Sequence, residues 1–243
     1  MKTKFPNLVE FEVYGKYALF SDPIMRLGGE KCSYQIPTYE GMKGVLSSVY
    51  WKPTFIWYID QIRIMNRIQT ETKGIRPIKM NGGNDLSYYT YLKQVRYQVQ
   101  AHFEWNDNRP ELSGDRNENK HHNIAKRMIE KGGRRDIFLG TRECQGYVVP
   151  CTFGEGSGSY DDIDEIQFGS MYHGITYPDE AYSEDTKGKL TVNFWRPVMK
   201  KGVIQFIRPE ECPQHKVIRR AEMKIFQNNR NFSGVDEYSQ PEV

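Results

Sequence analysis

The residues with the clearest capacity for chemistry form one short run, Asn117-Glu118-Asn119-Lys120-His121-His122. The chain has only five histidines, so two adjacent ones beside a lysine stand out. Histidine can transfer protons near neutral pH, and a lysine cation can hold phosphate oxygens. RNA cleavage without a metal ion needs both functions. An isolated cluster of this kind is more often a solvated basic patch on a helix end, so that interpretation stands beside the catalytic one.

The run is expected at the start of a helix. Asp115 and Glu118 have the spacing of a capping box. At about 100° per residue, His121 falls near the middle of the apolar stripe of that helix, with Lys120 and His122 on either side. The stripe consists of Ile124, Ala125, Met128 and Ile129. We therefore predict that His121 points inward, either as a hydrogen-bonded core histidine or in a cleft where the helix N-terminus favours an anion.

The elements that must position this run follow from the hydrophobic pattern. Apolar alternation predicts strands over 9–14, 55–65, 94–105 and 145–149, with a bulge at Asp60-Gln61. Thr38 is the expected N-cap of a helix that ends before Pro53, and Gly132-Gly133 should end the helix that carries His121. The order β-α-β-β-α-β indicates a ferredoxin-like α+β domain over residues 1–150. This fold supports many RNA-binding modules but also unrelated functions, and the familiar aromatic ribonucleoprotein signature is not evident.

The segments outside the predicted ferredoxin-like elements show other patterns. Residues 67–89 are expected to be an irregular insertion, and Gly154–Ser159 a flexible joint. Short strands near 166–172, 190–195 and 203–207 predict a small antiparallel β-sheet domain over 151–243, with the last two strands forming a hairpin. From Asn228 onward the sequence is polar and reads as a tail.

Basic residues mark possible RNA contacts. Arg134, Arg135 and Arg142 lie in a glycine-punctuated loop, where glycine permits close approach and arginine offers paired donors to phosphate. As a bare motif this signal is weak. With Lys31 these arginines are the candidate RNA-binding residues. The polar face of strand 94–105, which is rich in amides, is equally consistent with RNA contact and with plain surface.

Composition narrows the class of protein. The 243 residues are 38% hydrophobic and 27% charged, with a formal net charge of +3, as in a folded protein that tolerates nucleic acid without requiring it. The four cysteines form no Cys-x-x-Cys pair, and no Cys/His pair has zinc-site spacing, so no metal or other cofactor is expected. No signal segment or membrane span is evident. We expect a cytoplasmic protein with reduced thiols and no membrane partner.

Several stretches together resemble one family, the CRISPR-associated RAMP proteins of the type I-C (Dvulg) subtype, or Cas5d. The resemblance runs from about Val9 to Phe226, and the combination of motifs is highly specific. The stretches are Tyr17–Pro23, Gly28–Lys31, Tyr50–Pro53, Lys73–Pro77, Tyr89–Lys93, Asp115–Glu118 and Gly132–Gly140.

This resemblance implies a metal-independent endoribonuclease. Members of the family cut precursor CRISPR RNA within each repeat, beside a hairpin, and stay with the mature guide among the other subunits of a type I-C surveillance complex. The family's catalytic tyrosine, lysine and histidine match Tyr50, Lys120 and His121, while His122 matches no catalytic position. Without the resemblance, Tyr50 would read as a core tyrosine, because it follows Leu46 by four residues.

Three alternatives remain at this point. The chain could be a non-catalytic scaffold that binds the 5′ end of a guide RNA. It could bind duplex DNA nonspecifically through the basic loop and the Lys216, Arg219 and Arg220 cluster. A metal-dependent nuclease would need converging carboxylates, and Asp161-Asp162 with Asp164-Glu165 read instead as solvated surface.

Overall fold

A computed structural model describes residues 5–223, 225 and 227 of the chain. Six elements form its central unit: β1 (Val9–Ala18), α1 (Tyr39–Val49), β3 (Phe55–Ile64), β5 (Ser87–Trp105), α2 (Glu118–Glu130) and β7 (Gln145–Pro150). Their strands lie in the order β7-β1-β5-β3, and every neighbouring pair is antiparallel. This is the arrangement of a ferredoxin-like sheet, so the predicted fold class is confirmed. The predicted bulge is also present, as a register shift between Ile59 and Gln61.

The two helices are capped by side-chain oxygens. Thr38 accepts a hydrogen bond from the Gly41 N–H and begins α1, as expected. The cap of α2 is Asn117, which accepts from the Lys120 N–H, so the prediction that Asp115 caps this helix is wrong. Asp115 ends a short 3₁₀ turn, Pro110–Asp115, and its carboxylate is turned to other partners. At the far end of α2, Gly132 and Gly133 have φ of 81° and 110°, which a glycine stop requires.

The central sheet has one face packed against the helices and a second face that is only partly open. Val9, Phe11 and Val13 of β1 are buried in the main core together with Met42, Leu46 and Val49 of α1. The opposite face carries the polar residues of β5, yet Gln98 and His102 are also buried. Gln98 is hydrogen-bonded to backbone atoms of Gly154 and Glu155. The polar face of β5 is therefore not open surface at these two positions.

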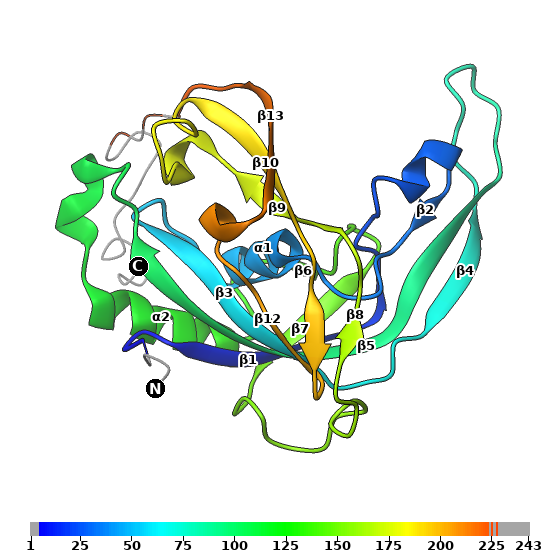
Figure 1. The fold of residues 1–243 in the computed structure, drawn as a ribbon, viewed down its shortest axis with the longest axis horizontal. Helices are drawn as coiled ribbons and strands as arrows, with labels where there is room; N and C mark the ends of the chain where they lie inside the picture. Colours follow the sequence, from blue (N-terminus) through cyan, green and yellow to red (C-terminus); the bar gives the residue numbers. More distant parts are fainter. Residues whose placement is uncertain (1–4, 224, 226, 228–243) are drawn as a thin grey trace, which may run out of the picture.

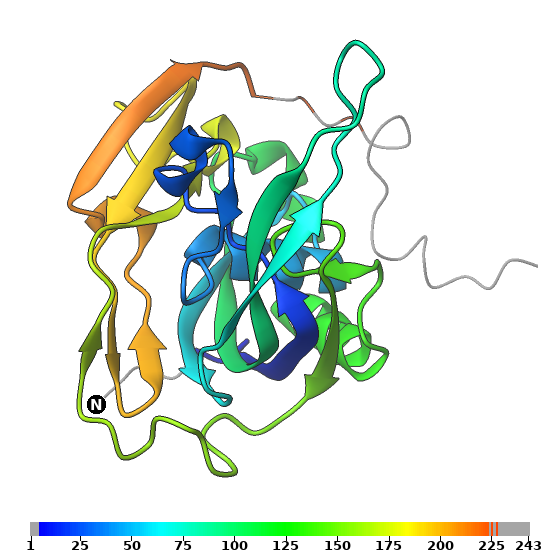
Figure 2. The same cartoon turned by 90° about the vertical axis from the view of Figure 1, so that its right-hand side faces the viewer.

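Beyond the central strands, β5 extends into an arm in which it pairs with both β4 (Thr70–Ile75) and β2 (Lys31–Cys32). β4 pairs with Ser87–Leu92 of β5, and β2 pairs with Tyr89 and Thr90 on the other side. A 3₁₀ turn, Met25–Gly28, lies next to β2. Figures 1 and 2 show this arm projecting from the body of the protein. Residues 67–89 were predicted to be an irregular insertion. That prediction is wrong for β4 and for the start of β5, which pair as a hairpin, while the residues between them form the loop at its tip.

The residues after 150 contribute to two sheets. β8 (Ile166–Gln167), β11 (Val198–Lys200) and β12 (Val203–Gln205) extend the central sheet through the pairing of β12 with β3, and β6 (Ile137–Phe138) forms its other edge. β9 (Met171–Thr176), β10 (Lys189–Trp195) and β13 (Gln214–Arg220) form a separate antiparallel sheet that packs on α1 (Figure 1). The hairpin joins β11 to β12, and the predicted pairing of 190–195 with 203–207 is wrong.

The segment expected to be a flexible joint is tied to the central sheet. The Arg63 guanidinium donates to the Glu155 and Gly156 carbonyls and to the Asp161 carboxylate, at 2.7 to 3.2 Å. The Gly158 N–H also donates to Asp161. A division of the chain at residue 150 stays a prediction, and the polar tail from Asn228 lies outside the described residues. No helix in the described part of the chain is both long and apolar enough to cross a membrane.

Candidate active site

Two residues that are 71 positions apart meet where α1 ends and α2 begins. The Tyr50 hydroxyl lies 2.8 Å from Nδ1 of His121. Tyr50 directly follows α1 and is held by its own N–H, which donates to the Leu46 carbonyl, and by the Trp57 indole N–H, which donates to the Tyr50 carbonyl. His121 lies in the first turn of α2 and is fully buried, as the position in the apolar stripe predicted.

The second ring nitrogen of His121 defines the protonation of the pair. Nε2 lies 2.7 Å from the Asp115 backbone carbonyl, which can only accept, so Nε2 carries the proton. In the neutral imidazole, Nδ1 is then the acceptor and the Tyr50 hydroxyl donates to it. The rings of Phe55 and Trp105 surround the imidazole edge-on, with centroids 5.3 and 5.8 Å away. The chain thus fixes both the orientation and the tautomer of His121.

Asp115 organises the charges beside this pair. Its carboxylate accepts from the Thr54 hydroxyl at 3.0 Å, and it lies 3.8 Å from Nζ of Lys120 and 3.5 Å from Nε2 of His121. The Lys120 side chain is 23% exposed, whereas Tyr50 and His121 are at most 3% exposed. Lys120 is therefore the member of the predicted catalytic set that solvent reaches most readily.

The environment shifts the acid strength of both buried groups. Burial lowers the pKa of His121, and the positive charges of Lys120 and Lys52 lower it further, against the opposing effect of Asp115. Burial and the Asp115 carboxylate raise the pKa of Tyr50 far above its ordinary value, while Arg134 acts in the other direction. Near pH 7 the site thus holds a neutral imidazole and a protonated phenol.

This arrangement can transfer a proton, with one condition. Both nitrogens of His121 are hydrogen-bonded within the protein, so exchange with a substrate must pass through one of these bonds. Nδ1 carries the free electron pair and faces the Tyr50 hydroxyl, which makes the Tyr50 side the route by which a proton can arrive. Nε2 is held by a backbone carbonyl and serves to orient the ring.

The predicted RNA-binding residues divide into two groups. Arg134 and Arg135 lie next to the cluster, because their backbone N–H groups donate to the Val49 and Ser48 carbonyls in the last turn of α1. Their side chains are exposed. Arg142 lies on the exposed turn between β6 and β7, and Lys31 lies on β2 of the arm, with its ammonium 4.8 Å from the Tyr89 ring centroid. These two are not brought to the cluster.

Sequence reasoning left out two residues that act on the charge of His121, and it gave a third, His122, no catalytic role. Lys52 and Asp115 both act on the charge of His121, yet Lys52 was not singled out and Asp115 was assigned to a cap. Lys52 could have been found from its position, because it lies two residues after Tyr50 and directly before Pro53. His122 contacts the Leu8 backbone carbonyl at 3.0 Å through Nε2 and takes no part in the cluster.

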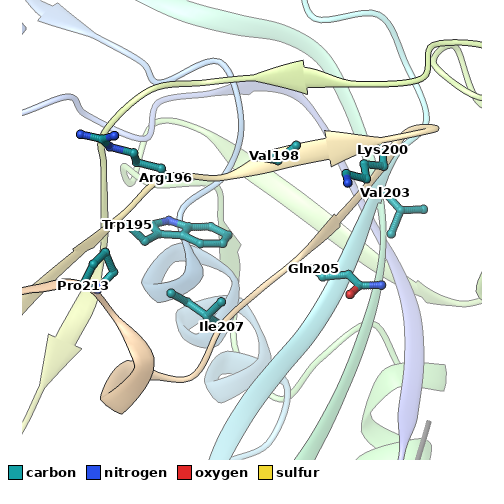
Figure 3. Close-up of a pocket in the computed structure, with 8 residues that line it drawn as sticks. All are labelled: Trp195, Arg196, Val198, Lys200, Val203, Gln205, Ile207 and Pro213. Carbon is teal, nitrogen blue, oxygen red and sulfur yellow. The ribbon is translucent and has the colours of Figure 1, made fainter. Parts of the chain in front are cut away.

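A separate pocket lies away from this cluster. It is formed between the β11–β12 hairpin and the end of β10, with Pro213 at one end and Lys200 and Gln205 at the other (Figure 3). None of the predicted site residues lines it, so pocket shape alone would have led away from the cluster. Within the described residues, no three His, Cys, Asp or Glu side chains gather in a way that could hold a metal ion.

A ferredoxin-like sheet extended by further antiparallel strands, with Tyr50, Lys120 and His121 where α1 ends and α2 begins, is consistent with a protein of the RAMP class. The sequence pattern of the family described as CRISPR-associated protein (Cas_Cas5), Cas5d, matches residues 8–207. The chain therefore belongs to the Cas5d family of CRISPR-associated proteins.

Individual relatives agree with this assignment. The chain is 27% identical over 228 residues to the CRISPR pre-crRNA endoribonuclease Cas5d of Mannheimia succiniciproducens, covering 82% of this chain and 94% of that protein. It is 28% identical over 153 residues to the protein of the same name from Thermus thermophilus, covering 58% and 63% respectively. A crystal structure of a CRISPR-associated protein superposes with a TM-score of 0.72 at 35% identity, covering 86% of this chain and 96% of the other.

Proposed function

We propose that this protein is a metal-independent endoribonuclease that cuts precursor CRISPR RNA within the repeat, beside a hairpin. The observation that carries the proposal is the 2.8 Å hydrogen bond between the Tyr50 hydroxyl and Nδ1 of His121, with Lys120 immediately before His121 in α2. The two relatives described above are named as pre-crRNA endoribonucleases, which supports the same activity.

The proposed reaction uses the RNA's own nucleophile. The 2′-hydroxyl attacks the adjacent phosphorus, and the bond from phosphorus to the 5′-oxygen of the next nucleotide breaks. The attacking hydroxyl passes its proton to the Tyr50 oxygen while Tyr50 passes its own proton to Nδ1 of His121, so the phenol is never left as an anion. The imidazolium that forms can return the proton to the leaving 5′-oxygen by the same route.

Lys120 has a separate role in this scheme. Negative charge grows on the non-bridging phosphate oxygens as the phosphorane forms, and a nearby ammonium stabilises that charge most in the transition state. The partial exposure of the Lys120 side chain suits a group that must meet a phosphate from solvent. Arg134 and Arg135, which follow the end of α2, would hold neighbouring phosphates as charge-assisted donors.

The setting of the activity is part of the same proposal. We place the protein in the cytoplasm, bound to repeat RNA before cleavage and to the mature guide afterwards, as a subunit of a type I-C surveillance complex. Residues 1–150 would supply the catalytic unit and residues 151–243 an appended β region. Recognition of the hairpin would rest on shape, phosphate contacts and unpaired bases, because the A-form major groove is too narrow to read.

The burial of His121 favours a second candidate function. A histidine with 0% exposure and both nitrogens bonded inside the protein is also what a purely structural residue looks like. In that case the protein would bind guide RNA without cutting it. Duplex-DNA binding has a location in the fold as well, since every residue of β13, including Lys216, Arg219 and Arg220, is exposed.

The experiment is cleavage of the host's repeat RNA in excess EDTA, beside the same RNA with a single 2′-deoxy substitution at the cut. We expect one discrete cut of the natural RNA, leaving a cyclic phosphate or 3′-phosphate upstream and a 5′-hydroxyl downstream. The deoxy RNA should remain intact because it lacks the nucleophile. Cleavage of the deoxy RNA at the same bond would refute the mechanism, and tight binding without any cut would establish the structural alternative.

A further inference from the structure

An exposed pair of tyrosines lies on the face of the central sheet that points away from the helices. Tyr14 of β1 and Tyr147 of β7 are direct cross-strand partners, and their ring centroids are 5.6 Å apart. Their neighbours Val13 and Val148 point into the core, as strand alternation requires. Tyr14 is 38% exposed and Tyr147 is 51% exposed, so both rings present π-surface to solvent.

The surface next to the tyrosines is concave and carries donors. The concavity is lined by Tyr14, Tyr147, Lys16, Gln94 and Arg96, among others. Lys16 is exposed and follows Tyr14 by two residues, so it lies on the same face of β1. Gln94 is also exposed, with a positive φ of 53° that interrupts the regular course of β5. A planar ring on the tyrosines would thus have a cation and an amide within the same concavity.

Charge on this surface favours an anionic occupant. Arg96, whose side chain is 50% exposed, pairs with Glu12 at 2.8 Å, so these two charges largely offset each other. Among the described residues, the ammonium of Lys16 makes a distant contact with the Tyr17 ring, at 5.6 Å from the centroid. One net positive charge therefore remains beside two exposed aromatic rings. Aromatic faces combined with a cation are what proteins use to hold single-stranded nucleic acid, since every base has a face that can stack.

We propose that Tyr14 and Tyr147, with Lys16 and Gln94, form a platform that stacks bases of single-stranded RNA on the sheet face opposite the Tyr50–His121 cluster. The proposal deepens the proposed function and rests on it, because a processing enzyme must also hold the unpaired RNA that flanks a hairpin. Lys16 contacts a phosphate, and the Gln94 amide can bond a base edge. Duplex RNA is excluded because its bases are already stacked and paired.

The cationic edge of the sheet connects this platform with the cluster. Arg134 and Arg135 precede β6 and adjoin the end of α1, while Arg142 follows β6 and leads into β7, which carries Tyr147. β6 is the edge strand on this side of the sheet. RNA that leaves the cluster along these arginines would reach the tyrosines around that edge.

The test is the affinity of the full chain for a fluorescein-labelled RNA of eight uridines, measured by anisotropy. The double variant Tyr14→Val/Tyr147→Val should weaken binding on the order of tenfold, because stacked bases lose their aromatic partner. Valine suits a strand, so the sheet should be retained, and circular dichroism checks this. The double variant Tyr14→Phe/Tyr147→Phe should bind within about twofold of the wild type, since the π-faces remain.

Three further measurements show where on the protein the RNA binds. Tyr182→Val, which removes a tyrosine of similar exposure outside the platform, should leave the affinity unchanged. Lys16→Glu should weaken binding and reduce the dependence of log Kd on log salt by about one ion. RNA that carries 5-iodouridine should crosslink under ultraviolet light to peptides containing Tyr14 or Tyr147.

Equal affinity of the wild type and the valine double variant, or crosslinks only to other peptides, would overturn the platform. Absence of any binding to the octamer would overturn it as well. Repeat cleavage in EDTA by the same proteins separates the two proposals. Binding that depends on the tyrosines without cleavage by the wild type would sustain the platform and refute the endoribonuclease.

Discussion

His121 and His173 occupy two regions of the molecule in nearly the same way, yet their neighbours differ. Both are fully buried, and both place Nε2 against a backbone carbonyl, of Asp115 and of Ile207 respectively. Burial lowers the pKa of both, to about 4 for His173. His121, however, has the Tyr50 hydroxyl on Nδ1, whereas Nδ1 of His173 has no hydrogen-bond partner among the described residues.

The surroundings of the two rings complete the contrast. His173 is stacked on Tyr39, with centroids 4.3 Å apart, and meets Trp195 edge-on in the second sheet. His121 lies within the influence of Lys120, Lys52 and Asp115 at the start of a helix. Burial and a depressed pKa therefore do not identify a catalytic histidine by themselves. A protonated donor on the basic nitrogen and charges that can meet a phosphate are what distinguish His121.

The largest expected effect separates the two histidines directly. His121→Ala should lower the single-turnover rate of repeat cleavage by about 10³-fold, within the usual range for a general acid–base group. His173→Phe should stay within a few-fold of the wild type, because His173 touches none of the cluster residues. Similar losses in both variants would show that folding, not chemistry, links them to activity, and thermal unfolding of each variant provides the control.

Replacement of the lysine is expected to have the next largest effect. Lys120→Gln removes the cation while keeping a side chain of similar length, so the rate should fall about 10²-fold. RNA affinity should change much less, since a single phosphate contact is a small part of the whole interface. Lys187→Gln is the matched control, because Lys187 is exposed and lies outside the cluster. A loss confined to affinity would reassign Lys120 to ground-state binding.

The pH dependence of cleavage should report on the same histidine. Because burial lowers the pKa of His121, the imidazole is neutral above a value that lies below 6.5, and the rate should fall only on the acid side of 6.5. The positive charge of Lys120 contributes to this depression, so Lys120→Gln should move the acid limb upward. A rate profile with the same acid limb in both proteins would dissociate His121 from the proton transfer.

The smallest effect concerns stability rather than activity. His173 has a folded-state pKa of about 4 and an unfolded value of about 6.5, so the unfolded chain binds the proton more readily. The contribution of the neutral His173 to the free energy of unfolding is complete above pH 6.5. It is lost as the pH falls toward 4, by about 1.4 kcal/mol per pH unit. Between pH 6.5 and 4, the free energy of unfolding measured in urea should depend less on pH in His173→Phe than in the wild type. The difference in slope should correspond to about one proton taken up on unfolding. An unchanged slope would mean that His173 is not kept neutral by burial.

Much of this site could be predicted from spacing alone. The stripe after Lys120 places His121 inward, and the apolar spacing from Leu46 places Tyr50 at the end of α1, as the structure confirms. That the two meet could not be derived, because their contact spans 71 residues and depends on how two helices pack. The resemblance implied Tyr50, Lys120 and His121 together, and the structure adds that Tyr50 and His121 are in direct contact.

The errors have physical causes too. Thr70–Ile75 is exposed on alternate residues and lacks an apolar face, so β4 showed no strand signal. Asp115 had the right spacing for a cap, but Thr54 and Lys120 compete for its carboxylate. The glycine-rich joint looked mobile because a linker pattern does not reveal Arg63, which binds it from 92 and 93 residues away. In each case a tertiary contact outweighed the local pattern.

The most direct test of the proposed catalytic pair is a double-mutant cycle with Tyr50→Phe, His121→Ala and both changes together, measured as single-turnover cleavage of repeat RNA in EDTA. If Tyr50 and His121 transfer one proton as a unit, the double variant should be no slower than the worse single variant. Losses that multiply would contradict the account, because two residues acting independently would lower the rate by the product of their separate effects.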